Sequence, residues 1–180
     1  RIARAAGYRE VVKAAHDLGV TSALPEGAPS LPLGTATLTL EELAGAYAAF
    51  ASGRYPVTVH GHVAGAKTPP NRLDRRREWA PMLDLLWEAA NVGTGRRAAV
   101  RLPTFGKTGT SQDGRDALFV GFAGDLICAV WIGRDDNKPI AGASGGRLPA
   151  QVWRNFMSGL RLKTLDLPAP PRASREIRLW

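Results

Sequence analysis

The sequence has almost no cysteine and no long apolar run, and each absence excludes a class of protein. The single cysteine, Cys128, cannot form an internal disulfide, and because it stands in the apolar stretch LICAVWI we expect it to be a small buried core residue. The best apolar candidate, residues 117–133, is interrupted by Gly124 and Asp125. A transmembrane helix needs about 20 apolar residues. We therefore expect no membrane contact by this segment itself.

Negative charge is also in short supply. The 180 residues include 24 Lys and Arg against 16 Asp and Glu, a formal net charge of +8. The arginines are scattered except at residues 75–77, so we predict no nucleic-acid partner despite the charge. Hydrophobic residues make up 44% of the chain, which is enough for a packed core. The chain opens without an initiator Met or an apolar leader, and we interpret it as part of something larger.

Apolar residues recur at helical spacing in several segments. Thr39 and Glu42 match a capping box at one helix start, and Gly53 is a stop signal near the end of that helix. Proline is tolerated in a first helical turn, which fits Pro81 and Pro149. The predicted helices cover residues 9–18, 39–53, 81–93 and 149–160. The last helix is predicted to pack on a sheet through Val152, Trp153, Phe156, Met157 and Leu160.

Stretches of strand length predict a sheet. The predicted strands are residues 57–63 (VTVHGHV), a strand through residues 107–110, and strands at residues 117–123 and 126–132. Gly124-Asp125 has the composition of a two-residue hairpin turn. A polar excursion from about residue 67 to 78 and a flexible loop, GTGRRA, connect these elements. The predicted fold class is α+β, an antiparallel sheet with packed helices, and the core is predicted to include Trp87, Trp131 and Trp153.

A short run of catalytic residue types lies on one predicted strand. It consists of Lys107, Thr108, Gly109 and Thr110, called the KTGT segment below. A phosphate-binding P-loop fits poorly, because Arg101 stands where its first glycine belongs and a turn follows. Acyl transfer fits better, with a cation, hydroxyls for a carboxylate, a backbone N–H for an oxyanion, and a glycine that allows close approach. The alternative, that the segment only fills a strand, stays open at this point.

The surroundings of the KTGT segment add a resemblance. K-T-G belongs to the motif set of penicillin-binding proteins and serine β-lactamases. Residues 1–160 resemble the C-terminal part of the transpeptidase domain of class A, bifunctional penicillin-binding proteins, with matches in family order at SLPLGTATLTLEELAGAYAAFASG, MLDLLWEAANVGTGRRA, GKTGTSQDGRDALFVGFAGDL, AVWIGRDD and GGRLPAQVWRNFM. The chain departs from the family at Leu118, where Trp is common, and at Arg54, where Gly is common. The fold implied is a partial penicillin-binding, serine β-lactamase-like transpeptidase fold.

The resemblance implies a role for each residue of the KTGT segment. Lys107 would tune the site electrostatically and assist proton movement around the nucleophile. Thr108 and Thr110 would bind the terminal carboxylate of D-Ala-D-Ala or of a β-lactam, beside Gly109, and the Thr110 amide would be half of the oxyanion hole. The implied partners are the peptidoglycan stem peptide and β-lactams. No cofactor or metal is implied, since serine acyl transfer needs none.

The nucleophile of such an enzyme is not in this sequence. No serine is followed by lysine three residues later, and no Ser-x-Asn occurs. Both motifs lie upstream in the family, so we expect this chain to supply one wall of an active site and to be inactive without the missing N-terminal part of the same protein. That part would carry the glycosyltransferase domain and an anchor that holds the protein at the periplasmic, extracytoplasmic face of the inner membrane.

Several narrower expectations complete this picture. Residues 1–163 are predicted to belong to the transpeptidase domain, and residues 164–180 to form a Pro/Arg-rich, extended or mobile tail. Two other functions stay open: a non-catalytic module of this fold that binds cell-wall peptide or a protein partner, and a serine β-lactamase or D,D-carboxypeptidase. His60 and His62 lack a third ligand and are interpreted as surface residues, and Asp135 and Asp136 as a solvated turn.

Overall fold

A three-stranded antiparallel sheet forms the centre of the fold. The computed structural model describes residues 1–61 and 69–168 of the chain. The strands are β3 (Thr104–Thr110), β4 (Asp116–Ala123) and β5 (Leu126–Gly133), in that spatial order. Gly124, at φ 57°, opens the two-residue turn between β4 and β5, because a left-handed turn position favours glycine. These three strands and the α+β class are as the sequence predicted.

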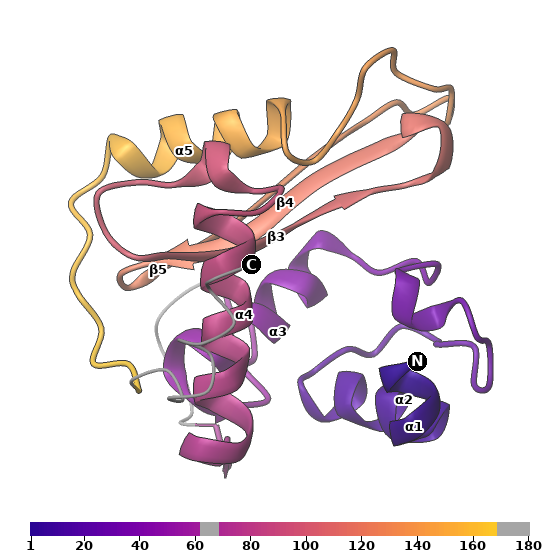
Figure 1. The fold of residues 1–180 in the computed structure, drawn as a ribbon, viewed down its shortest axis with the longest axis vertical. Helices are drawn as coiled ribbons and strands as arrows, with labels where there is room; N and C mark the ends of the chain where they lie inside the picture. The colour runs from indigo at the N-terminus through magenta and orange to yellow at the C-terminus, as the bar shows by residue number, and fades with distance from the viewer. Residues whose placement is uncertain (62–68, 169–180) are drawn as a thin grey trace.

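Helices lie on both sides of this sheet (Figure 1). α5 (Leu148–Ser158) runs along one face, α3 (Leu40–Ser52) lies on the opposite side, and α4 (Ala80–Asn91) packs against β3 and contributes side chains to both. The α5 side is filled by Ala90, Ala98, Phe119, Ala123, Ala150, Trp153 and Met157. The other side is filled by Ala51, Leu83, Leu86, Phe105 and Phe122. Because side chains alternate along a strand, successive residues of β3 face these two clusters in turn.

The helices begin and end close to their predicted limits. The capping box is present, since the Thr39 hydroxyl accepts from the Glu42 amide at 3.1 Å and the Glu42 carboxylate accepts from the Thr39 amide. Gly53, at φ 70°, ends α3, and Pro81 stands in the first turn of α4. The predicted helix at residues 9–18 is α2 (Tyr8–Asp17), preceded by a short α1 (Ile2–Ala6) that periodicity did not reveal.

One predicted strand is wrong. Residues 57–61 are not a strand, and residues 62–68, including His62, lie outside the described part of the chain. The two-residue strand β1 (Arg54–Tyr55) instead pairs with β2 (Asn71–Arg72). Alternation of side chains does not make a strand unless a neighbouring chain supplies hydrogen bonds, and here the pairing starts earlier. His60 is exposed, as expected, and within residues 1–61 and 69–168 no three His, Cys, Asp or Glu residues gather as metal ligands.

The polar and glycine-rich connections carry more structure than predicted. Asp74 accepts hydrogen bonds from the Arg76 and Arg77 amides and starts the π-helical turn η2 (Arg75–Trp79), which leads into α4. The GTGRRA loop contains the 3-10 turn η3 (Arg96–Ala98), whose last residue is fully buried. Two further 3-10 turns are η1 (Leu31–Leu33) and η4 (Gln112–Gly114).

Burial departs from the prediction at five positions. Trp131 is 45% exposed and donates from Nε1 to Asp116, so it is not in the core. Cys128 is half-buried, and that burial raises the pKa of its thiol. A helix can turn only one stripe toward a sheet, and α5 uses Trp153 and Met157 for it. The other predicted core positions of this segment are exposed, namely Val152, Phe156 and Leu160.

The chain after α5 returns along the sheet. The Lys163 amide donates to Asp125 in the β4–β5 turn at 2.8 Å, and Leu165 and Leu167 pack against the cluster around Phe122. The boundary at residue 163 stays a prediction. Across residues 1–61 and 69–168, no helix combines the length and the apolar content that crossing a bilayer requires.

Candidate functional site

The KTGT segment lies on β3, at one edge of the sheet. β3 pairs only with β4 in the described part of the chain. Just past this ladder, Ser111 donates its amide to Asp116 O at 2.9 Å, toward β4. Amides alternate in direction along an antiparallel strand, so the Thr110 and Thr108 amides point away from β4. Thr104 is an even-numbered position like 108 and 110, and its backbone should also point away from β4. Its carbonyl does so, because it accepts a hydrogen bond from Asn91 Nδ2 in α4 at 2.7 Å.

The side chains of the segment are divided between the two faces of the sheet. In the register of β3 and β4, Thr108 lies opposite Phe119 and Gly106 opposite Gly121. Phe119 belongs to the cluster on the α5 side, so Thr108 and Thr110 face that side as well. Lys107 and Gly109 share the opposite side with Phe105. The cation and the hydroxyls that are neighbours in sequence therefore point in opposite directions.

The edge of β3 brings the cation and one hydroxyl together. Lys107 is exposed, and its Nζ bends over the edge to donate to the Thr108 carbonyl at 3.0 Å and to Thr108 Oγ1 at 3.4 Å. Both of these hydrogen bonds stay within the KTGT segment. The unpaired edge thus presents an ammonium group, outward amides and a hydroxyl to the same space.

Two residues that the sequence reasoning missed hold the threonines on the α5 side. Thr94, in the loop after α4, shares a hydrogen bond of 2.7 Å with Thr108 Oγ1. Gly145, in the loop before α5, donates its amide to Thr110 Oγ1 at 3.1 Å. The sequence contains the strings GTG at residues 93–95 and GG at residues 145–146. Nothing in their spacing connects them to Thr108 or Thr110, because the residues are too far apart along the chain.

Glycine at positions 145 and 146 is required by close packing. A Cβ on Gly145 would overlap the main chain of Gly109 and Leu118, and a Cβ on Gly146 would overlap the Thr94 carbonyl oxygen. The loop before α5 is therefore packed directly on the back of the KTGT segment and on the Thr94 loop. It supports both threonines from the side opposite Lys107.

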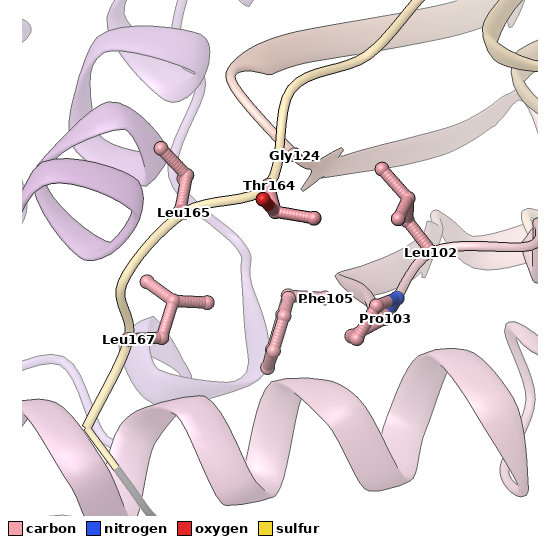
Figure 2. A pocket seen from close by; sticks show the side chains of 7 residues that line it. All are labelled: Leu102, Pro103, Phe105, Gly124, Thr164, Leu165 and Leu167. Carbon is pink, nitrogen blue, oxygen red and sulfur yellow. The ribbon is translucent and has the colours of Figure 1, made fainter.

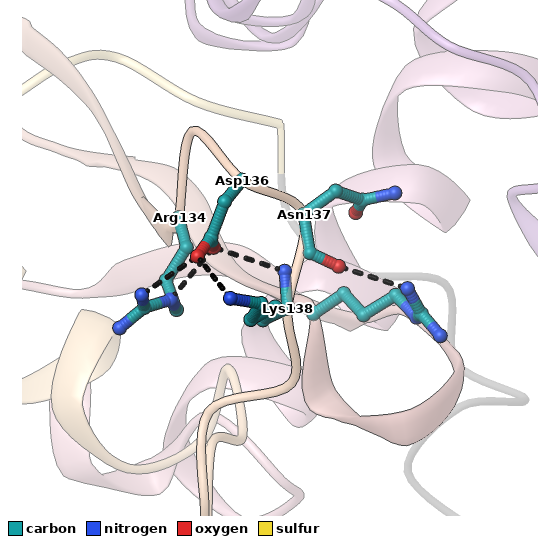
Figure 3. A network of polar contacts seen from close by, with 5 residues as sticks. Arg134, Asp136, Asn137 and Lys138 are labelled. Atoms are coloured by element: carbon teal, nitrogen blue, oxygen red, sulfur yellow. Dashed lines mark hydrogen bonds and ion pairs between the residues drawn. The ribbon is translucent and has the colours of Figure 1, made fainter.

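A polar network stabilises the rim of the sheet near the end of β3 (Figure 3). Asp136 receives two hydrogen bonds from the Arg134 guanidinium at 2.8 Å, which hold the pKa of its carboxyl at about 2, and it pairs with Lys138 at 3.3 Å. Arg115, just before β4, donates to the Asn137 carbonyl at 2.8 Å. Asp135 and Asp136 are exposed in a turn, as predicted. This network attaches the loop after β5 to the β3–β4 connection.

A small pocket lies at the other end of β3 (Figure 2). It has about 80 Å³ of space and is lined by Leu102, Pro103, Phe105, Gly124, Thr164, Leu165 and Leu167. Its lining has no ionisable side chain, and so it offers neither an acid, a base nor a charged anchor. The KTGT edge, with its ammonium group and outward amides, is therefore the better candidate for chemistry.

Comparisons with known proteins agree on one group. No family model matches the chain. It is 35% identical over 147 residues to penicillin-binding protein 1A of Neisseria gonorrhoeae, an alignment that covers 71% of this chain and 18% of that protein. It is 33% identical over 162 residues to penicillin-binding protein 1A of Neisseria flavescens, covering 77% and 20%. Identity to penicillin-binding protein 1B of Vibrio cholerae is 29%, covering 91% and 23%.

A solved structure shares the fold. The crystal structure of penicillin-binding protein 1A from Haemophilus influenzae matches with a TM-score of 0.70 and 22% identity, over 92% of this chain and 33% of that one. The chain thus spans about a fifth of the length of the curated relatives named above.

Proposed function

Because this chain belongs to the class A penicillin-binding proteins, within their transpeptidase domain, we propose that it is part of a peptidoglycan D,D-transpeptidase that joins cell-wall stem peptides by serine acyl transfer. One observation carries the proposal: among the described residues no strand pairs with the outer edge of the KTGT segment, and the Lys107 ammonium bends over that edge. The longer protein would act on the extracytoplasmic side of the membrane, held there by residues outside this chain.

The chemistry divides into two steps. A serine hydroxyl from another part of the same protein attacks the carbonyl carbon between the two D-alanines, the C–N bond breaks, and the serine proton passes to the amine of the departing D-alanine as the acyl ester forms. An amine of a second stem peptide then attacks the ester, forms the new amide and releases the serine. An extended peptide suits the edge of β3, since it can hydrogen-bond there as an added strand.

Each residue of the KTGT segment has a part in this proposal. Lys107 places a positive charge where the serine proton is moved and where the substrate carboxylate arrives. Thr108 and Thr110 donate hydroxyl hydrogen bonds to that carboxylate, and the Thr110 amide is one of the two donors to the oxyanion. Gly109 adds no side chain on the face that it shares with Lys107.

Covalent labelling by a fluorescent penicillin tests the proposal. The complete protein that contains this chain and the 180-residue chain alone are each incubated with the probe and separated on a denaturing gel. We expect label on the complete protein only, because the chain has no Ser-x-x-Lys. No label on a folded complete protein would overturn the proposal in favour of a non-catalytic module that binds cell-wall peptide or a protein partner. Label on the short chain would show that the nucleophile lies within it.

A further inference from the structure

Two threonines from distant parts of the chain meet at the back of the candidate site. Thr94 Oγ1 and Thr108 Oγ1 are 2.7 Å apart, an ordinary hydrogen-bond distance between two hydroxyls. Thr94 belongs to the loop after α4, and Thr108 belongs to β3. The sequence motif that suggests acyl transfer includes Thr108 but says nothing of Thr94.

The loop that carries Thr94 is held firmly in place. The amides of the two flanking glycines donate back to α4, Gly93 to Glu88 O at 2.8 Å and Gly95 to Ala89 O at 2.9 Å. A Cβ on Gly95 would lie 2.8 Å from the Phe119 ring, and Gly146 packs against the Thr94 carbonyl. The Thr94 hydroxyl is therefore presented to Thr108 from a fixed main chain rather than from a free loop.

Hydrogen-bond capacity decides what this contact does. A threonine hydroxyl has one proton to donate and two lone pairs that accept, while a lysine ammonium only donates. Lys107 already donates to one lone pair of Thr108 Oγ1. If Thr94 donates to the second lone pair, neither neighbour uses the single Thr108 proton, and it can be donated to a substrate. An ionised carboxylate only accepts, so its arrival selects this arrangement.

Thr110 makes a similar contact on the α5 side, and in it the donor can only be a backbone amide. Its Oγ1 accepts from the Gly145 amide, which has no lone pair to offer in return. The Thr110 proton is thus left for a substrate as well. Both hydroxyls of the segment are thus contacted from the α5 side.

We propose that Thr94 is a positioning residue, which donates its hydroxyl proton to Thr108 Oγ1 and so directs the Thr108 proton toward the carboxylate of the substrate. This inference rests on the transpeptidase function proposed above. It assigns Thr94 no contact with the reacting atoms, and its effect is confined to ligands that carry the carboxylate.

The test compares two penicillins that differ only in that group. The complete protein is acylated by benzylpenicillin and by its methyl ester, which has no ionised carboxylate, and the second-order rate constants are measured. For Thr94→Val we expect the acid to react about 10-fold more slowly, since one hydrogen bond to a charged group is weakened, and the ester to change by less than about twofold. Thr94→Ser keeps the hydroxyl and restores the rate with the acid.

A double-substitution cycle separates positioning from general damage. Thr108→Val should give the same selective loss, and combining it with Thr94→Val should add nothing, because Thr94 acts only through Thr108. Thr35→Val is the matched control, because Thr35 also makes an exposed hydroxyl–hydroxyl contact, with Ser30 at 3.2 Å, on the segment before α3. Its two rate constants should equal those of the unchanged protein.

Each remaining outcome contradicts the inference in a recognisable way. Equal slowing of acid and ester by Thr94→Val would make Thr94 a structural residue only, and no slowing of either would remove its role altogether. If the unchanged protein reacts with neither penicillin, the proposed function itself fails, and the positioning role of Thr94 fails with it.

Discussion

Gly109 and Leu118 face each other across β3 and β4 so closely that a Cβ on Gly109 would lie 2.8 Å from Leu118 Cγ. The sequence suggested that Gly109 leaves room for a substrate. The structure adds a second reason, since the leucine side chain fills the space that any larger residue at 109 would need. The residue at 118 therefore limits which side chain can stand at position 109.

This contact predicts a pair of compensating substitutions. Gly109→Ala should destabilise the protein by about 1–3 kcal/mol, because the added methyl overpacks a filled space. Leu118→Ala removes the obstructing atoms, so the double variant should be more stable than the sum of the two single effects. The melting temperatures of the three variants in the complete protein measure this. Simple additivity would show that position 109 is limited by something other than Leu118.

Lys107→Ala should slow acylation by penicillin by at least about 100-fold, because the substitution removes the charge that assists proton movement at the serine. Lys107 is exposed and both of its hydrogen bonds go to Thr108, so the fold should be unaffected. The rate of fluorescent-penicillin labelling and the melting temperature are read on the same preparation. Unchanged labelling would refute the role proposed for Lys107.

The start of α3 predicts a pH dependence of stability. The hydroxyl hydrogen bond from Ser22, followed by the bonds from the amide of Thr39 and from the hydroxyl and amide of Thr21, holds the pKa of the Glu42 carboxyl well below its usual range. A lowered pKa in the folded state stabilises the protein above the unfolded value of about 4.3. That contribution is lost as the pH falls further toward the folded pKa.

The comparison with Glu42→Gln isolates this effect. At pH 7 the variant should melt at a lower temperature than the unchanged protein, because an amide accepts these hydrogen bonds less strongly. The difference between the two should shrink steadily below about pH 4.3. A difference that stays constant from pH 7 to pH 3 would mean that the Glu42 charge does not stabilise the fold.

The core on the α5 side predicts a contrast within one helix. Trp153 is fully buried, packs edge-to-face on Phe119 at 5.2 Å and donates from Nε1 to Cys128 O at 2.9 Å. Trp153→Ala should cost about 3–5 kcal/mol of unfolding free energy, the usual loss for a buried aromatic residue. Phe156, on the same helix, is 53% exposed, and Phe156→Ala should change stability by about 0.5 kcal/mol or less. Urea unfolding of both variants decides the matter, and similar losses would contradict the assignment of the buried face.

Local signals in the sequence were enough for most of the elements. Thr39, Glu42 and Gly53 set the limits of α3 because capping depends on residues only a few positions apart. The β4–β5 hairpin was readable for the same reason, since its turn needs only Gly124 and Asp125. The strand predicted at residues 57–63 failed because a strand depends on a partner, and alternation of side chains carries no information about one.

The sequence by itself determined the chemistry available to this protein: a lysine, two threonines and a glycine on one strand, with no Ser-x-x-Lys to complete them. Only the tertiary structure decided how those groups are arranged. Strand geometry separates Lys107 from the two threonines onto opposite faces, and at the edge of β3 the Lys107 ammonium bends back to Thr108. Thr94 and Gly145 reach the threonines through contacts between distant segments, which depend on packing rather than on local spacing.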